Sequence, residues 1–210
     1  MKNLITILLS LLLLASCSNK KTNKYESFYE ILDELLRFNY HDAGVVVLDL
    51  NKTRQGPVVS LDYNGDTIKN ITSPPPPPGS VYYSKNIFID LYKGGFLDSI
   101  DISFMFSQID TLRNVTLDSS RIIKKTISSF SLIQLFKQYG LDSTYQILRQ
   151  KYDAYSYIEI STPLISKNGN KILLDVDEYC GGLCGGGRTY LFEKIKSKWR
   201  IIYSKGNWVS

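Results

Sequence analysis

The sequence predicts an α+β fold: an N-terminal helix, a small β-hairpin region, a helical middle and a C-terminal antiparallel β-meander with one disulfide. Two observations predict it. Residues 25–38 and 129–151 repeat apolar side chains at helical spacing. Residues 157–203 instead alternate β-branched and aromatic runs with turns containing glycine, which is typical of antiparallel strands.

The first structured element is expected to be an amphipathic helix over Tyr25–Phe38. It is followed by a predicted strand at Val45–Leu48. A hairpin is then expected, in which Val58–Tyr63 returns through Asn64-Gly65 into Thr67–Thr72. The apolar face of the helix consists of Phe28, Ile31, Leu32, Leu35 and Leu36.

Five consecutive prolines, residues 74–78, follow the hairpin. They have no backbone donors and a fixed φ, so they predict an extended polyproline stretch. It is either a stiff connection, which we favour, or a ligand for a proline-binding partner. The segment 74–79 is therefore a possible internal boundary in the domain.

The middle of the chain is predicted to be helical. Val81–Leu91 fits a strand or a helix, and Asp101 is expected to cap a short helix that runs to Gln108. Two helices should follow, Ser129–Tyr139 ended by Gly140 and Asp142–Lys151 capped by its first residue.

The C-terminal meander is predicted from four strand-like runs. They are separated by Asn168-Gly169, by a loop of cysteines and glycines, and by a short turn. The runs are Tyr157–Ile165, Lys171–Tyr179, Thr189–Ile195 and Trp199–Tyr203.

The first sixteen residues have the features of a signal peptide. Lys2 precedes an apolar run, Leu4–Leu14, that is about half of the roughly 20 residues a membrane-spanning helix needs. Leu14-Ala15-Ser16-Cys17 resembles the lipobox of bacterial prolipoproteins, which implies acylation of Cys17 and attachment to a membrane. Ser18 after the cysteine resembles the sorting pattern of outer-membrane lipoproteins, which implies the outer membrane of the cell envelope. Residues 17–24 then form a polar tether, and 25–210 form a single α+β domain.

The three cysteines fit this assignment. With Cys17 acylated, Cys180 and Cys184 remain as a pair that is expected to be oxidised outside the cytoplasm. Three residues separate them, whereas thiol–disulfide oxidoreductases usually have two at a helix N-terminus. A structural disulfide is therefore favoured over a redox centre.

The charge of the chain does not indicate a nucleic-acid-binding protein. Of its 25 basic residues, Lys2 lies in the signal and Lys20, Lys21 and Lys24 lie in the tether, which leaves 21 basic against 20 acidic residues. A nucleic-acid-binding domain would need clustered basic side chains. The tether lysines are better placed to contact acidic lipid head groups.

The C-terminal half is similar to the C-terminal pattern of uncharacterised bacterial envelope lipoproteins. The resemblance lies in the segments 162–169, 180–187 and 198–201 and in the terminal 208–210, with the sequence Cys-Gly-Gly-Leu-Cys-Gly-Gly-Gly at its centre. It covers roughly residues 100–210. The resemblance implies a shared fold and envelope location and carries no catalytic residue with it.

Two groups of residues are candidates for chemistry. Gly185, Gly186, Gly187 and Arg188 form a possible ligand loop that offers backbone N–H groups and a guanidinium to an anion, although glycines that only permit positive φ are the simpler interpretation.

Asp175, Asp177 and Glu178 suggest calcium binding or acid–base chemistry, although a solvated strand face is the favoured interpretation. His41 is the only histidine, so no multi-histidine metal site is expected.

No cofactor or metal motif and no catalytic residue is predicted. These observations favour a membrane-anchored envelope protein with a non-catalytic binding or assembly role, through an envelope protein partner or a small ligand of unknown kind. A carboxylate-based periplasmic hydrolase acting on glycan or peptide is the first alternative, and a thiol–disulfide protein using Cys180 and Cys184 is the second.

Overall fold

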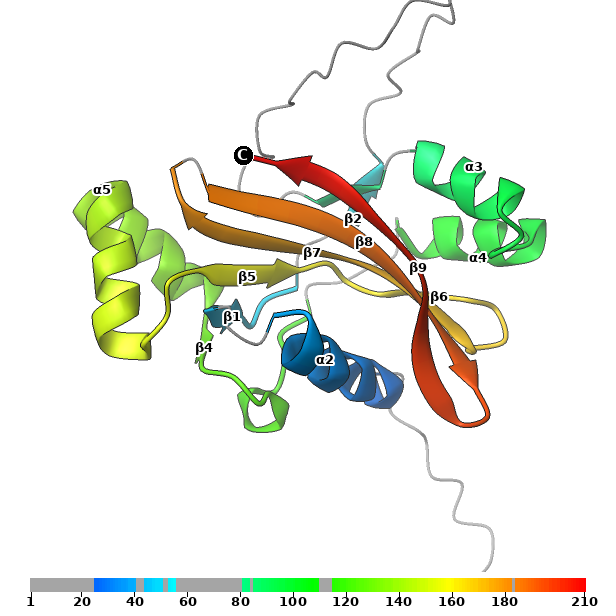
Figure 1. The fold of residues 1–210 in the computed structure, drawn as a ribbon, viewed down its shortest axis with the longest axis horizontal. Coiled ribbons are helices and arrows are strands. Elements are labelled where there is room, and N and C mark those ends of the chain that lie inside the picture. Colours follow the sequence, from blue (N-terminus) through cyan, green and yellow to red (C-terminus); the bar gives the residue numbers. More distant parts are fainter. Residues whose placement is uncertain are drawn as a thin grey trace, which may run out of the picture.

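A mostly antiparallel seven-stranded sheet lies at the centre of the molecule, with helices on both of its faces (Figure 1). The predicted α+β class is confirmed. This computed structural model describes residues 25–40, 44–50, 53–55, 81–83, 85–109, 115–182 and 184–210. The helices of the described part are α2 (Glu26–Phe38), α3 (Lys85–Lys93), α4 (Ser99–Ile109) and α5 (Ser129–Tyr152).

The C-terminal strands form the predicted meander. β7 (Lys171–Gly181), β8 (Cys184–Ile195) and β9 (Lys198–Val209) pair in sequence order, and β5 (Tyr157–Ile160) adds to β7 on the other side. The prediction of one strand over Tyr157–Ile165 is wrong in detail. The strand breaks after Ile160 and resumes as β6 (Leu164–Ile165), because Pro163 has no N–H to donate to a neighbouring strand.

The early strands pair in parallel. β1 (Val45–Val47), a strand that the sequence predicted, lies between β5 and β4 (Thr126–Ile127) and is parallel to both. β2 (Thr53–Gln55) and β3 (Val81–Tyr83) form a separate parallel pair, and β3 leads into α3, so Val81–Leu91 is a strand followed by a helix. The expected hairpin at 58–72 and the prolines 74–78 lie outside the described residues.

Helix α2 covers one face of the sheet with the apolar stripe that the sequence predicted. These side chains are fully buried and pack against alternate residues of β5, β7 and β8, among them Ile158, Leu174 and Phe192. Burying a large apolar side chain contributes about 1.5–3 kcal/mol, so this layer is a major source of stability.

Two helical units cover the ends of the opposite face (Figure 1). At one end, α5 places Leu132 and Leu148 against Tyr157 and Tyr179 of the sheet. At the other end, α3 and α4 pack on Leu173 and Leu191. The side chains between these two clusters are polar, and they form the candidate site.

The predicted helices are present, but two of their predicted caps are wrong. Asp142 does not cap the second half of α5, because the helix resumes at Leu141 directly after Gly140. Asp98, rather than Asp101, accepts the hydrogen bond from the N–H of Asp101 (2.7 Å) and begins α4 at Ser99. Asp101 is buried and accepts from the N–H of Lys167 (3.2 Å). Gly140, with φ 73° and ψ −174°, divides α5 into the two expected halves. None of the described helices is long and apolar enough to cross a membrane.

Candidate functional site

Three acidic side chains meet on the sheet face between α5 and the α3–α4 pair. Glu159 on β5 is directly opposite Asp177 on β7, and Asp175 lies two residues earlier on the same face of β7. We call Glu159, Asp175 and Asp177 the acidic strip. Their exposed fractions are 6%, 3% and 4%.

The favoured interpretation of this face as solvated is therefore wrong. Alternation along β7 correctly placed Asp175 and Asp177 on one face, but it carried no information on whether other elements cover that face. Glu178 points to the other face, where its Oε1 accepts a hydrogen bond from Ser156 Oγ (2.8 Å). The strip thus gains Glu159 from β5 in place of Glu178.

Asp175 is hydrogen-bonded to neutral side chains. Its Oδ1 accepts hydrogen bonds from Thr189 Oγ1 on β8 and from Asn207 Nδ2 on β9 (3.4 Å). Thr189 Oγ1 also lies 3.1 Å from Asn207 Oδ1, and a hydroxyl has one proton to donate to these two acceptors. A proton on Asp175 would supply the hydrogen bond that the single hydroxyl proton of Thr189 cannot. Asn207 is exposed and forms the rim of the site.

Asp177 is bonded to the last tryptophan of the chain. Trp208 Nε1 donates to Asp177 Oδ1 (2.8 Å), and the indole passes over Gly187 of β8 to reach it. A Cβ at position 187 would lie 2.1 Å from both of these bonded atoms. A Cβ at Gly185 would lie 3.0 Å from the indole. These two glycines make room for Trp208.

The expected ligand loop is part of a strand. Gly185, Gly186 and Gly187 lie in β8 and are paired with β7 and β9, and none of them has a positive φ. Their backbone groups thus form hydrogen bonds within the sheet. This corrects both interpretations of the segment, as an anion-binding loop and as a loop whose glycines permit positive φ. Arg188 is exposed, and its Nη1 donates to Ser204 Oγ (3.3 Å).

Burial raises the pKa of both β7 carboxyls. Loss of hydration raises the pKa of Asp175 to about 8, and the nearby charge of Asp177 acts in the same direction. Loss of hydration likewise raises the pKa of Asp177 to about 7, with a further contribution from Glu159. At neutral pH the strip therefore holds at least one proton, and it lies where a positive charge would be favoured.

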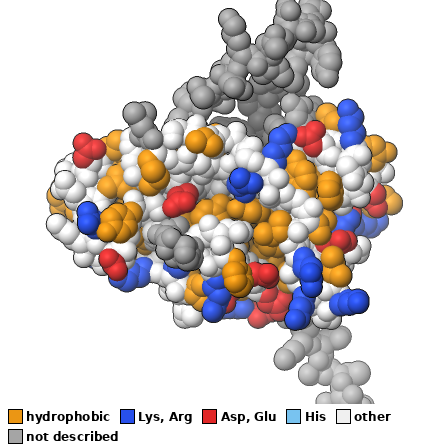
Figure 2. Space-filling view, viewed as in Figure 1, with side chains coloured by type: hydrophobic (Ala, Val, Ile, Leu, Met, Phe, Trp, Pro, Cys, Tyr) orange, Lys and Arg blue, Asp and Glu red, His pale blue; other side chains and the backbone are white. Residues whose placement is uncertain are grey.

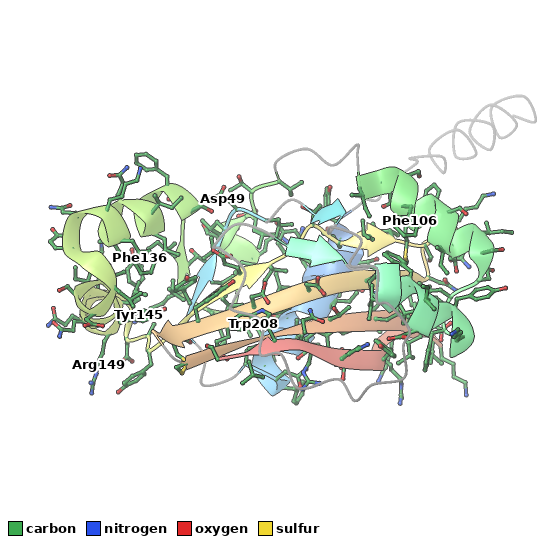
Figure 3. All side chains as sticks on the ribbon, turned by 90° about the horizontal axis from the view of Figure 1, so that it is seen from above. Asp49, Phe106, Phe136, Tyr145, Arg149 and Trp208 are labelled. Carbon is green, nitrogen blue, oxygen red and sulfur yellow. A yellow bond between two sulfur atoms is a disulfide. The ribbon has the colours of Figure 1, made fainter. Side chains whose placement is uncertain are left out.

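An aromatic row borders the acidic strip. Trp208 contacts Tyr179 (ring centroids 5.2 Å apart), Tyr179 stacks on Tyr157 (4.9 Å), and Tyr157 stacks on Tyr145 of α5 (6.2 Å). Figure 3 shows Phe136 and Tyr145 on α5 at one end, Phe106 on α4 at the other, and Trp208 between them. Burial raises the pKa of Tyr145 to about 12, and the pKa values of Tyr157 and Tyr179 are also raised, so the row is neutral at physiological pH.

The disulfide of Cys180 and Cys184 closes the turn between β7 and β8. The pair lies at a hairpin end and not at a helix N-terminus, where a helix dipole would stabilise a thiolate. The two other singled-out residues, Cys17 and His41, lie outside the described part of the chain.

Sequence reasoning found part of this site and missed the rest. No sequence pattern indicated a functional role for Glu159, Thr189 or Asn207. Trp208 was part only of the resemblance to envelope lipoproteins. The signal that connects them is strand register, because Glu159, Asp177, Gly187 and Trp208 form one row across β5, β7, β8 and β9. Register could not be assigned before the bulges in β8 and β9 were known.

Among the described residues, no group of three or more Asp, Glu, His or Cys side chains is arranged to hold a metal ion. The site is therefore a set of buried, hydrogen-bonded carboxyls beside an aromatic row, with an exposed amide at its rim. Compared with known proteins, the chain matches no family model, no curated protein and no solved structure.

Proposed function

We propose that this protein is a lipid-anchored protein of the cell envelope, on the outer membrane, that acts by binding a partner and not by catalysis. The acidic strip receives a basic side chain of an envelope protein. The observation that supports this proposal is that Asp175 and Asp177 are buried with only neutral hydrogen-bond donors around them in the described part of the chain.

Burying a carboxyl group without a positive partner costs free energy, because the charged form loses its hydration. A lysine or arginine brought in by a partner would offset this cost and form charge-assisted hydrogen bonds. Trp208 and Tyr179 beside the strip supply the flat apolar surface on which such side chains commonly lie. The exposed Asn207 places the strip next to solvent.

The experiment is a mild cross-linking pull-down of the native, membrane-anchored protein, followed by identification of the captured envelope proteins. The wild type is compared with the double variant Asp175→Asn/Asp177→Asn, which keeps the shape of both side chains and removes the two β7 carboxyls from the strip. We expect one partner in stoichiometric amount with the wild type and its loss with the double variant.

The matched control is Asp153→Asn, because Asp153 is an exposed carboxylate at the end of α5 and is not part of the strip. This control should retain the partner. Equal capture by the wild type and the double variant, or recovery of the protein alone, would contradict the proposal.

A second candidate function is a carboxylate-based hydrolase, and the raised pKa of Asp175, about 8, favours it. A carboxyl that keeps its proton at neutral pH has the property required of a general acid. This candidate predicts that the wild type releases soluble fragments from purified cell-wall glycan or peptide and that Asp175→Asn does not. Absence of release by the wild type would exclude these substrates.

A further inference from the structure

The α3–α4 pair exposes apolar side chains at one end of the molecule. Ile89 and Tyr92 on α3 are 48% and 58% exposed, and Ile100 and Phe104 on α4 are 57% and 40% exposed. A groove of about 420 Å³ runs between the helices, and Phe88 and Phe106 contribute to its walls.

Helix α4 is apolar on both of its sides. Met105 and Ile109 point into the core, while Ile100 and Phe104 point outward. Large apolar side chains on the exposed side of a helix whose other side is already buried indicate a surface that is covered in the working protein.

The same end of the molecule is basic. The turn between β8 and β9 exposes Lys194, Lys196, Lys198 and Arg200. Figure 2 shows basic side chains among apolar and acidic ones at this end of the molecule. Among the described residues, three acidic side chains lie next to this turn. Glu193 lies 4.0 Å from Lys171, Glu30 accepts a hydrogen bond from Trp199 Nε1 (3.1 Å), and Glu34 lines a groove together with Lys198 and Arg200. Clustered exposed lysines next to apolar side chains are typical of surfaces that contact acidic phospholipids.

The start of α2, the first described helix after the proposed lipid anchor, lies at this end. The N-terminal half of α2 lies against Trp199, at the start of β9, and the α3–α4 pair is joined to the same end of the sheet by Lys171 Nζ, which donates to the carbonyl of Phe96 (2.7 Å). Tyr25 lies eight positions after Cys17, which gives a reach of about 27 Å for an extended chain.

By contrast, α5 lies at the far end of the sheet, and the 11 residues of β7 between the two ends span about 36 Å (Figure 1). The tether therefore brings the α3–α4 end to the bilayer more readily than the α5 end.

We infer that the α3–α4 surface and the β8–β9 turn lie on the phospholipid surface of the membrane that holds the lipid of Cys17. The inference rests on the proposed lipid anchor. The exposed apolar residues enter the head-group region and the four basic residues face acidic head groups. The acidic strip, on the middle of the sheet, then stays free to meet a partner.

The test uses the full-length acylated protein in vesicles of phosphatidylethanolamine and phosphatidylglycerol, with and without bromine on the acyl chains. Tyr92→Trp places a fluorophore on the proposed surface, and Tyr155→Trp, at a site of matched exposure (60% against 58%), places one at the α5 end. We expect brominated lipid to quench Trp fluorescence in Tyr92→Trp beyond the background of Trp199 and Trp208, and to leave Tyr155→Trp at that background.

A second variant tests the basic turn. Lys196→Glu/Lys198→Glu in the Tyr92→Trp protein should reduce the quenching, and added salt should reduce it in the parent, because both weaken attraction to acidic lipid.

Three results would overturn the inference. The first is equal quenching in the two Trp variants, and the second is quenching only in Tyr155→Trp. The third is a Trp signal in Tyr92→Trp that changes with protein concentration and not with lipid. The last result would indicate a second copy of the chain on this surface. Mass analysis of the N-terminus separates failure of the anchor from failure of this placement, since a chain without lipid on Cys17 overturns both.

Discussion

At the scale of single residues, the absence of a side chain at position 187 allows Trp208 to reach Asp177. The backbone of β8 would otherwise place a Cβ 2.1 Å from both partners of that hydrogen bond. The glycine run that looks like a flexible loop in the sequence is thus a packing feature of a paired strand.

Gly187→Ala is expected to lower the free energy of unfolding by about 1–3 kcal/mol, because the new methyl group displaces the indole and breaks its bond to Asp177. Chemical denaturation measures this change. Gly206→Ala in β9 is the control, since its Cβ meets no atom within 4 Å and it should be nearly neutral. Equal effects of the two substitutions would show that the strip does not depend on Trp208.

Asp175 gives a prediction on pH. Its pKa of about 8 in the folded protein is above its ordinary value of 3.8, so the folded state binds more protons than the unfolded state between these values. Stability should therefore fall as pH rises through this window. Asp175→Asn removes this titration and should make the curve of unfolding free energy against pH less steep, and Asp177, whose pKa is also raised, keeps part of the slope.

The measurement is denaturant unfolding at a series of pH values for the wild type, Asp175→Asn and the exposed control Asp153→Asn. The control should follow the wild type. A wild type whose stability rises steadily towards pH 8 would contradict the raised pKa values of Asp175 and Asp177.

At the scale of elements, a single residue shapes the longest helix. Gly140 divides α5 with φ 73° and ψ −174°, a region that residues with a Cβ rarely enter. Thr144 Oγ1 then donates to the carbonyl of Gly140 (2.6 Å) in the following turn.

Gly140→Ala should destabilise the fold by about 1–3 kcal/mol through backbone strain alone, because its Cβ would meet no atom within 4 Å. Urea denaturation compares it with Ser143→Ala on the same helix, which should be neutral or slightly stabilising. A neutral Gly140→Ala would mean that α5 can continue straight through this position.

The disulfide gives the second prediction at this scale. It closes a five-residue loop between β7 and β8, so reduction should lower the unfolding free energy by about 2 kcal/mol through chain entropy and leave the paired strands intact. Denaturation with and without reductant measures the loss. Complete retention of the disulfide in a glutathione buffer would count against the thiol–disulfide alternative, and ready reduction would favour it.

At the scale of the whole molecule, the proposed anchor decides where the binding site can act. Cys17→Ser should move the protein from the membrane to the soluble envelope fraction and abolish incorporation of labelled fatty acid, because acyl chains contribute about 0.8 kcal/mol per buried methylene. Cell fractionation measures this, with Cys184→Ser as the control that keeps the anchor. Membrane retention of Cys17→Ser would contradict lipidation as the means of attachment.

The sequence by itself determined the elements with strong local signals. The apolar stripe of α2, the glycine break in α5, and the run of strands from β5 to β9 follow from periodicity and from backbone preferences. The α+β class follows from these elements. The cap of α4 was misplaced by one turn because Asp98 and Asp101 are both acceptable capping residues.

Only the tertiary structure decided what the strands bring together. The parallel pairing of β1 with β4 and β5, the row from Glu159 to Trp208, and the burial of Asp175 and Asp177 depend on register and on which elements cover a face. A one-residue shift in register moves every side chain to the other face, so local patterns cannot fix these relations. The physical reason is that burial and strand pairing are properties of contacts between segments distant in sequence, whereas helix and strand preferences are properties of each segment alone.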